Sequence, residues 1–106
     1  MTTRKSAIDQ KLRVCFYAIA EVTAIEYIEG ERRTISKREF FEIKVDDVPS
    51  SAFRNGKIPT HAIHMAEQKI IEMIDIKYYP NGFLKKWDLF TDPKCANRVS
   101  TYKRAN

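Results

Sequence analysis

The sequence predicts a small soluble α+β domain made of a long antiparallel β-hairpin, one amphipathic helix and at least one further strand, in the order ββ-loop-α-β. Three observations predict this fold class. Residues 12–45 alternate between apolar and polar side chains around a central turn, residues 62–74 repeat apolar side chains with a helical period, and residues 83–90 return to a strand pattern. We expect the helix to cover the face of the hairpin that carries the even-numbered side chains of its first strand.

The first strand begins at Leu12 and is unusually long. Its even positions up to Ala24 are all apolar, whereas its odd positions mix polar, charged and aromatic residues. A period of two with many β-branched and aromatic residues is typical of a strand. Because a typical strand has ~5–6 residues, we expect a bend or a bulge within this one.

The dipeptide Glu29-Gly30 is a two-residue turn signal that predicts the register of the hairpin. The second strand runs from about Arg32 to Val45. A slip of one residue would place charged side chains against the apolar row, so the register is well specified. The predicted apolar pairs are Val14–Val45, Phe16–Ile43, Ala18–Phe41 and Ala24–Ile35, and the pairs on the other face are Glu21–Arg38, Thr23–Ser36 and Ile19–Phe40.

The second strand has one alternative. Residues 36–39, Ser-Lys-Arg-Glu, fit a capping box that could begin a short helix. The alternation of Phe41, Ile43 and Val45 just beyond it favours a strand.

The helix lies between a loop and a tight turn. Residues 46–59 are rich in turn-forming residues, and Thr60 is the expected N-cap of the helix. Residues 79–82, Tyr-Pro-Asn-Gly, predict a turn before the last strand at residues 83–90. The apolar side of the helix consists of Ala62, Ile63, Ala66, Ile70, Ile71, Met73 and Ile74.

The length and the charge distribution predict one domain, residues 1–106, with two basic ends. The net charge is +5, and residues 1–13 and 91–106 each hold four Lys or Arg against one Asp, which leaves eleven basic and twelve acidic residues between them. We therefore expect an ordered core of about residues 11–91. The basic ends 1–10 and 92–106 are expected to add little to the stability of the fold.

The two cysteines, Cys15 and Cys95, show no metal-binding or redox spacing. Cys15 lies in an apolar strand pattern and is expected in the core, so a reducing, cytoplasmic setting is favoured over a disulfide. No apolar run approaches the ~20 residues of a membrane-spanning helix, and no membrane association is expected.

The second face of the hairpin carries an apolar cluster that predicts a protein-interaction surface. A single helix covers one face of a sheet, so this cluster stays exposed unless residues 46–59, the C-terminal segment or a partner covers it. A symmetric homodimer is the expected partner, with Phe40 and Ile19 near its centre. The cluster consists of Tyr17, Ile19, Ile25, Tyr27 and Phe40.

Basic residues with aromatic neighbours offer a nucleic-acid-binding alternative. Such groups can contact phosphates and stack on bases, although acidic residues are interleaved with them. The candidate contacts are Arg32, Arg33, Lys85, Lys86, Trp87, Lys103 and Arg104.

The sequence offers little indication of catalysis, cofactors or metals. His61, His64 and Glu67 have a helical spacing that could place them around a metal ion, but a fourth ligand is not evident, and a surface role is favoured. Glu67 falls inside the apolar arc of the helix, where we expect an ion pair with a basic residue of the hairpin. The chain lacks a nucleophile arrangement and a Gly-rich phosphate loop.

The sequence therefore predicts a non-enzymatic protein-binding module of the adaptor or inhibitor type, without catalytic residues, cofactor or metal. Nucleic-acid binding through the basic ends is the alternative function. A compact single domain without catalytic motifs is common among accessory proteins of phages and mobile elements, which suggests such an origin.

Overall fold

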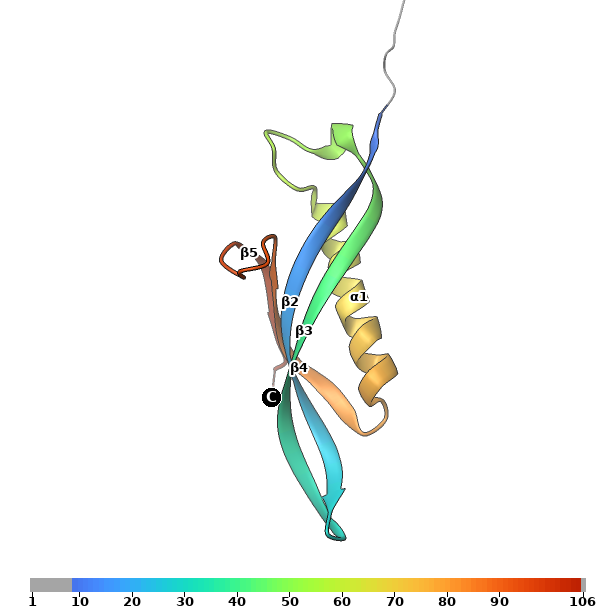
Figure 1. Ribbon diagram of the computed structural model, residues 1–106, viewed down its shortest axis with the longest axis vertical. Helices are drawn as coiled ribbons and strands as arrows, with labels where there is room; N and C mark the ends of the chain where they lie inside the picture. The colour runs from blue at the N-terminus through green and yellow to red at the C-terminus, as the bar shows by residue number, and fades with distance from the viewer. Residues whose placement is uncertain (1–8, 106) are drawn as a thin grey trace, which may run out of the picture.

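The computed structural model describes residues 9–105. Within these residues the chain forms a four-stranded antiparallel sheet in the order β3-β2-β4-β5, with one α-helix packed on one face (Figure 1). This architecture confirms the predicted α+β class. The elements are β2 (Lys11–Ile28), β3 (Glu31–Pro49), the short 3-10 helix η1 (Ser50–Ala52), α1 (Thr60–Tyr78), β4 (Gly82–Phe90) and β5 (Arg98–Lys103).

The β2–β3 hairpin has the predicted register. Glu29 and Gly30 both have positive φ angles, 53° and 81°. Positive φ angles at both positions give a two-residue turn whose twist matches that of the two strands. Phe16 pairs with Ile43 and Glu21 with Arg38, and the other predicted pairs are also present. The bend or bulge expected in the first strand is present as two shifts in pairing register. One lies between Leu12 and Val14 in the pairing with β3, and the other between Glu21 and Val22 in the pairing with β4. Residues 36–39 lie inside β3, so the helical alternative for them is wrong.

The core lies between the even-numbered face of β2 and α1. Ala18 and Ala20 of β2 and Ala62 and Ala66 of α1 are all fully buried in this core. Their small side chains let the helix lie close to the sheet, and larger side chains fill the space on either side. The largest fully buried side chains are Phe16, Val22, Val45, Val48, Ile70, Ile74 and Leu89.

The ends of α1 differ in one detail from the prediction. Thr60 is the first helical residue and Pro59 takes the N-cap position, without a side-chain cap. Proline suits a helix start because the first N–H groups have no partner within the helix. At the other end, a Cβ on Gly82 would lie 2.9 Å from the Cβ of Tyr78. The turn into β4 is therefore tight enough to require a glycine.

The C-terminal segment corrects the expectation that residues 92–106 lie outside the ordered core. Residues 98–103 form β5, which pairs with β4. Tyr102 stacks on the buried Trp87, with ring centroids 4.6 Å apart. The loop before β5 is held by Asp92, whose carboxylate accepts the main-chain N–H of Asn97 at 2.7 Å. This bond holds the pKa of Asp92 below its usual range.

The N-terminal end meets the loop that follows β3. Residues 1–8, most of the basic end predicted at 1–10, lie outside the described residues. Asp9 accepts hydrogen bonds from the hydroxyl of Ser51, from its N–H at 2.8 Å and from the hydroxyl of Ser50 at 2.9 Å. These bonds lower the pKa of Asp9, with the Ser51 hydroxyl as the main cause. The start of the described chain is thus fastened to η1.

The hairpin extends beyond the rest of the domain. Figure 1 shows the turn end of β2 and β3 projecting past the C-terminal end of α1 and past the start of β4. The pairing of β4 with β2 stops at Ala24, so residues 25–34 form a two-stranded ribbon, called here the hairpin tip. Within residues 9–105, no helix has both the length and the apolar character needed to cross a membrane.

Candidate interaction surface

The open face is the sheet face opposite α1. It is formed by odd-numbered side chains of β2 and by even-numbered side chains of β3 up to Lys44, together with the side chains of β4 and β5 that pair with them. The cross-strand pairs place Phe40, Ile19, Asp88 and Thr101 in one row across all four strands. The neighbouring row contains Arg38, Glu21, Lys86 and Lys103.

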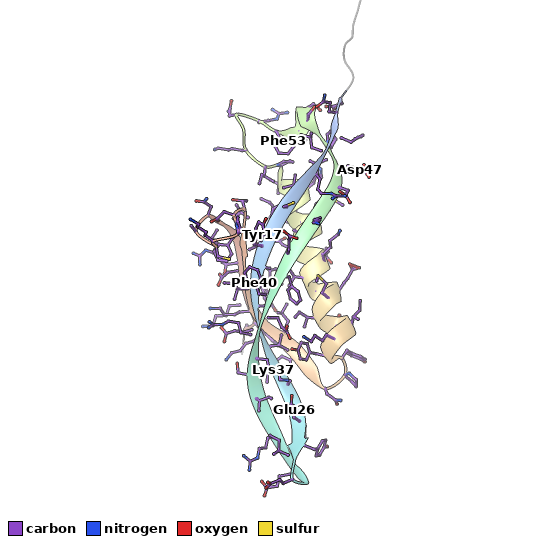
Figure 2. The ribbon with its side chains drawn as sticks, viewed as in Figure 1. Tyr17, Glu26, Lys37, Phe40, Asp47 and Phe53 are labelled. Carbon is purple, nitrogen blue, oxygen red and sulfur yellow. The ribbon has the colours of Figure 1, made fainter. Side chains whose placement is uncertain are left out.

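The structure divides the predicted apolar cluster into two parts. Tyr17, Ile19 and Phe40 lie on the four-stranded part of the sheet, whereas Ile25 and Tyr27 lie on the hairpin tip. Figure 2 shows Tyr17 and Phe40 on the same stretch of the hairpin. Phe40 is 58% exposed and Tyr27 is 74% exposed, while the other three side chains are half-buried. The strongest apolar feature of the four-stranded part is therefore Phe40.

Phe90 is a member of this surface that sequence reasoning missed. It pairs directly with Tyr17 and is half-buried beside it. Burial raises the pKa of the Tyr17 phenol, and the carboxylate of Glu42 raises it further. The alternation of β4 could assign Phe90 to a face only once β2 was known to be its neighbour.

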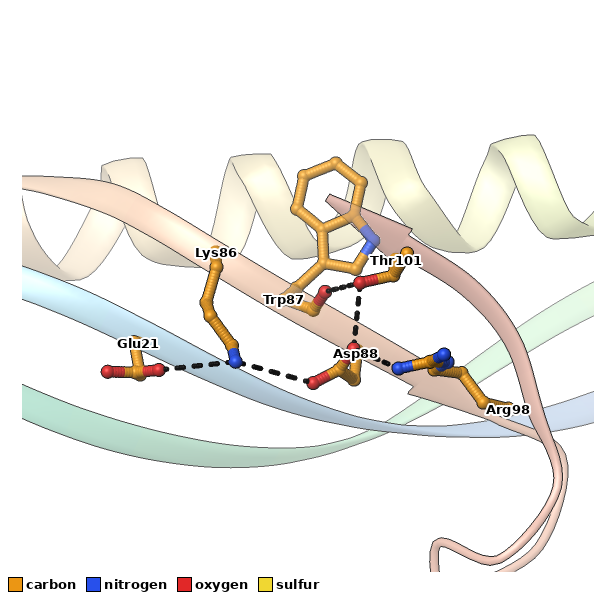
Figure 3. A network of polar contacts seen from close by, with 6 residues as sticks. All are labelled: Glu21, Lys86, Trp87, Asp88, Arg98 and Thr101. Carbon is orange, nitrogen blue, oxygen red and sulfur yellow. Dashed lines mark hydrogen bonds and ion pairs between the residues drawn. The ribbon is translucent and has the colours of Figure 1, made fainter. Parts of the chain in front are cut away.

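Most charges on the open face are paired with one another. Figure 3 shows Lys86 between Glu21 and Asp88, with Nζ–oxygen distances of 3.6 and 4.0 Å, and Arg98 on the other side of Asp88 at 3.4 Å. Thr101 adds a hydrogen bond to Asp88 at 2.8 Å. Such partly exposed pairs contribute little to stability, but the two basic and two acidic side chains in this group balance each other in charge.

The predicted nucleic-acid contacts separate into three places. Trp87 is only 6% exposed and lies on the helix side of β4, so the prediction that it could stack on a base is wrong. Lys85 and Lys86 gather with Lys103 and Arg104 where β4 and β5 meet. There Lys86 pairs across the strands with Lys103, and the N–H of Arg104 bonds to the carbonyl of Lys85.

The arginines at the hairpin tip are remote from that basic group. Arg32 and Arg33 follow the turn at the start of β3, and the guanidinium of Arg33 lies 3.2 Å from the carboxylate of Glu31. The tip also holds Glu26, which pairs with Lys37 at 2.6 Å. The tip therefore mixes both signs of charge and does not extend the basic group.

Glu67 has partners other than the one predicted. Its carboxylate accepts a hydrogen bond from the hydroxyl of Ser100 on β5 and lies 2.9 Å from Nδ1 of His64. The expected ion pair with a basic hairpin residue is wrong, because Glu67 lies on the β5 side of the helix. Among residues 9–105, no three His, Cys, Asp or Glu side chains come together as metal ligands.

The two cysteines are free, and neither belongs to a group of possible metal ligands in the described chain. Cys15 is half-buried on the open face, beside Lys44, and not in the core as its apolar neighbours indicated. Burial raises the pKa of the Cys95 thiol, which disfavours its thiolate form.

Comparison of the chain with protein-family models, with curated proteins and with solved structures finds no match.

Proposed function

We propose that this chain is a non-enzymatic protein-binding module of the adaptor or inhibitor type, which binds protein, including a second copy of itself, through the open face. The observation that carries the proposal is Phe40, which is 58% exposed beside Ile19 on a sheet face that α1 does not cover. An aromatic ring in this position gains about 25 cal/mol for each Å² of apolar surface that a partner removes from water.

The surroundings of Phe40 also suit a protein partner. Tyr17 and Phe90 continue the apolar surface, and the neighbouring charges Glu21, Lys86 and Asp88 are already paired. A desolvated aromatic centre with a polar rim is the usual composition of a protein interface. The two free cysteines support a reducing compartment such as the cytoplasm as the place of action.

The test is the oligomeric state in solution. We expect the wild-type protein to show concentration-dependent self-association in analytical ultracentrifugation and Phe40→Asp to be monomeric with an unchanged circular dichroism spectrum. Tyr79→Asp is the control, because Tyr79 is 77% exposed but lies at the end of α1. A wild-type protein that stays monomeric at high concentration would contradict self-association. If Phe40→Asp unfolds, Phe40→Ser makes the same test with a smaller perturbation.

A second function, nucleic-acid binding, is favoured by one observation. Lys85, Lys86, Lys103 and Arg104 gather at one edge of the sheet, although they come from two strands and are separated in the sequence. Contacts of this kind act on phosphates without reading sequence, and their affinity falls steeply with salt.

Fluorescein-labelled single-stranded DNA and RNA oligonucleotides test this second function. The nucleic-acid alternative requires binding that weakens with salt and that the double variant Lys103→Glu/Arg104→Glu abolishes. Binding that Phe40→Asp abolishes while the double variant keeps it would assign the nucleic acid to the open face. Absence of binding at low salt removes the alternative.

A further inference from the structure

We propose that a second copy of this chain binds along the free edge of β3, antiparallel to it, with the two-fold axis at Phe40. The two four-stranded sheets would then form one continuous sheet. This inference rests on the proposed function, which it deepens by naming the partner, the strand edge and the register.

The edge of β3 is long, and no other strand of the described chain pairs with it. β3 is the outermost strand on its side of the sheet and extends over 19 residues. The Lys69 ammonium donates a hydrogen bond of 2.7 Å to the carbonyl of Lys44, so the main-chain groups of Lys44 point to the free edge. Since alternate residues of a strand share this direction, even-numbered residues 32–42 also present their N–H and C=O groups there, whereas the shift in pairing near Leu12 changes the pattern beyond Val45. An exposed edge of this length is a template for another strand.

On the open face, the side chains of β3 match one another when the strand is paired with itself about Phe40. The two Phe40 rings become direct neighbours on the open face, and Arg38 of each copy lies opposite Glu42 of the other. Ser36 lies opposite Lys44. Each dimer thus gains one aromatic pair and two pairs of opposite charge.

The neighbouring registers lack this match. A shift of the axis to Glu39 places Arg38 opposite Phe40 and brings the two Glu39 carboxylates together. A shift to Phe41 places Arg38 opposite Lys44, which are like charges. Cross-strand like charges are unfavourable, so the charge pattern of β3 selects the axis at Phe40.

The helix adds apolar surface beside the same edge. Lys77 contacts Glu39 at 2.8 Å and Lys69 contacts Lys44, so the helical residues between them lie alongside the centre of β3. Met73 and Ile76 are on this side of α1, 36% and 85% exposed. In the two-fold dimer, Met73 and Ile76 of each copy would face the same residues of the other copy. The dimer would thus cover apolar side chains that α1 exposes.

The opposite edge of the sheet is a poorer site for a second copy. β5 has six residues, and its charged side chains, Arg98 and Lys103, are both basic. Pairing two copies of β5 would bring like charges together over a short length. The sheet therefore has one edge suited to self-pairing and one that discourages it.

A charge exchange tests the register. We expect Arg38→Glu to weaken self-association by at least about tenfold, because the introduced carboxylate would face Glu42 of the other copy twice in each dimer. The double variant Arg38→Glu/Glu42→Arg restores opposite charges in this register alone, so its Kd should return to within about threefold of the wild type. Lys103→Glu is the matched control, because it makes the same charge change in the same cross-sheet row at the β5 edge.

Amide hydrogen exchange gives a second readout that needs no substitution. In the dimer, the outward N–H groups of Arg38, Phe40 and Glu42 should exchange at least about tenfold more slowly at high than at low protein concentration. Face-to-face association would leave these amides unprotected.

The outcomes separate this inference from the proposed function. If the wild type self-associates, Phe40→Asp is monomeric, and Arg38→Glu binds as the wild type does with unprotected edge amides, the edge register is wrong and open-face binding stands. If the wild type is monomeric, both the inference and the self-association fail. If Arg38→Glu is monomeric but the double variant is not rescued and the amides are unprotected, Arg38 acts elsewhere and the register is also overturned.

Discussion

The two halves of the β2–β3 hairpin have the same pairing but different surroundings. The helix-covered half consists of residues 14–24 and 35–45, and the other half is the hairpin tip, residues 25–34. Residues 14–24 of β2 alternate between buried and half-buried side chains, because α1 packs on one face and β4 pairs along the edge. Residues 25–34 pair in the same continuous register, yet their side chains are mostly exposed. Both halves therefore share the hydrogen bonds between β2 and β3, but only the helix-covered half contributes to the hydrophobic core.

It follows that the helix, and not the hairpin, sets the extent of the core. A two-stranded ribbon alone is at best marginally stable in water. The hairpin tip persists because it continues a ribbon whose other half is held under α1. We expect the largest effects of substitution in the helix-covered half and the smallest at the tip.

The largest effect is expected for Phe16→Ala. Phe16 is fully buried in the helix-covered half, opposite Ile43. Truncation should lower the free energy of unfolding by about 3–5 kcal/mol, because it removes apolar contacts and leaves a cavity. Urea denaturation measures the change. A loss below about 1 kcal/mol would mean that the core does not depend on this ring.

The next effect is expected on deleting residues 95–106. The composition of this segment indicated a nearly unchanged melting temperature, but the structure reverses the expectation. Removing β5 uncovers Trp87 by taking away the stacked Tyr102. We expect a loss of about 2 kcal/mol or more, visible as a lower melting temperature. Tyr102→Ala, which keeps the strand, should produce part of this loss, and an unchanged melting temperature for both variants would contradict the role of β5.

A smaller, pH-dependent effect is expected at Glu39. Its carboxylate accepts hydrogen bonds from Lys77 and from the Tyr78 hydroxyl, and these lower its pKa, with Lys77 as the main cause. A lowered folded pKa stabilises the protein above the unfolded pKa, and the stabilisation is lost as the pH falls through the folded pKa. Glu39→Gln should therefore cost about 1 kcal/mol near pH 7.

The control for Glu39 is to compare the stability of Glu39→Gln with that of the wild type at acidic pH. The difference between Glu39→Gln and wild type should shrink as the pH falls through the lowered pKa of Glu39, because the protonated glutamate loses the stabilisation. Thermal unfolding at several pH values measures it. A difference that is independent of pH would assign the effect to packing and not to charge.

The smallest effect is expected for Tyr27→Ala. Tyr27 is 74% exposed on the hairpin tip and outside the cover of α1. Its truncation should change the free energy of unfolding by no more than about 0.5 kcal/mol. A loss similar to that of Phe16→Ala would show that the tip packs against something in solution and would end the contrast between the two halves.

Local patterns were sufficient to predict the hairpin and the helix. The Glu29-Gly30 turn and the period of two determine every pair from Val14–Val45 to Ala24–Ile35, since a turn of known length leaves one register. The apolar period of residues 62–74 likewise determines which helix face is buried at Ala62, Ala66, Ile70 and Ile74. These features depend on neighbours in sequence or on one short turn.

Other features depend on which distant segment becomes a neighbour, and local patterns do not contain that information. The polar segment at residues 98–103 becomes a strand because β4 offers it an edge and Trp87 offers Tyr102 a surface. Glu67 meets Ser100 for the same reason, and Phe90 joins Tyr17 only because β4 pairs with β2. The alternation within each strand thus follows from the order of its residues, whereas the order of the strands, and with it the free edge at β3, follows from packing between segments far apart in the chain.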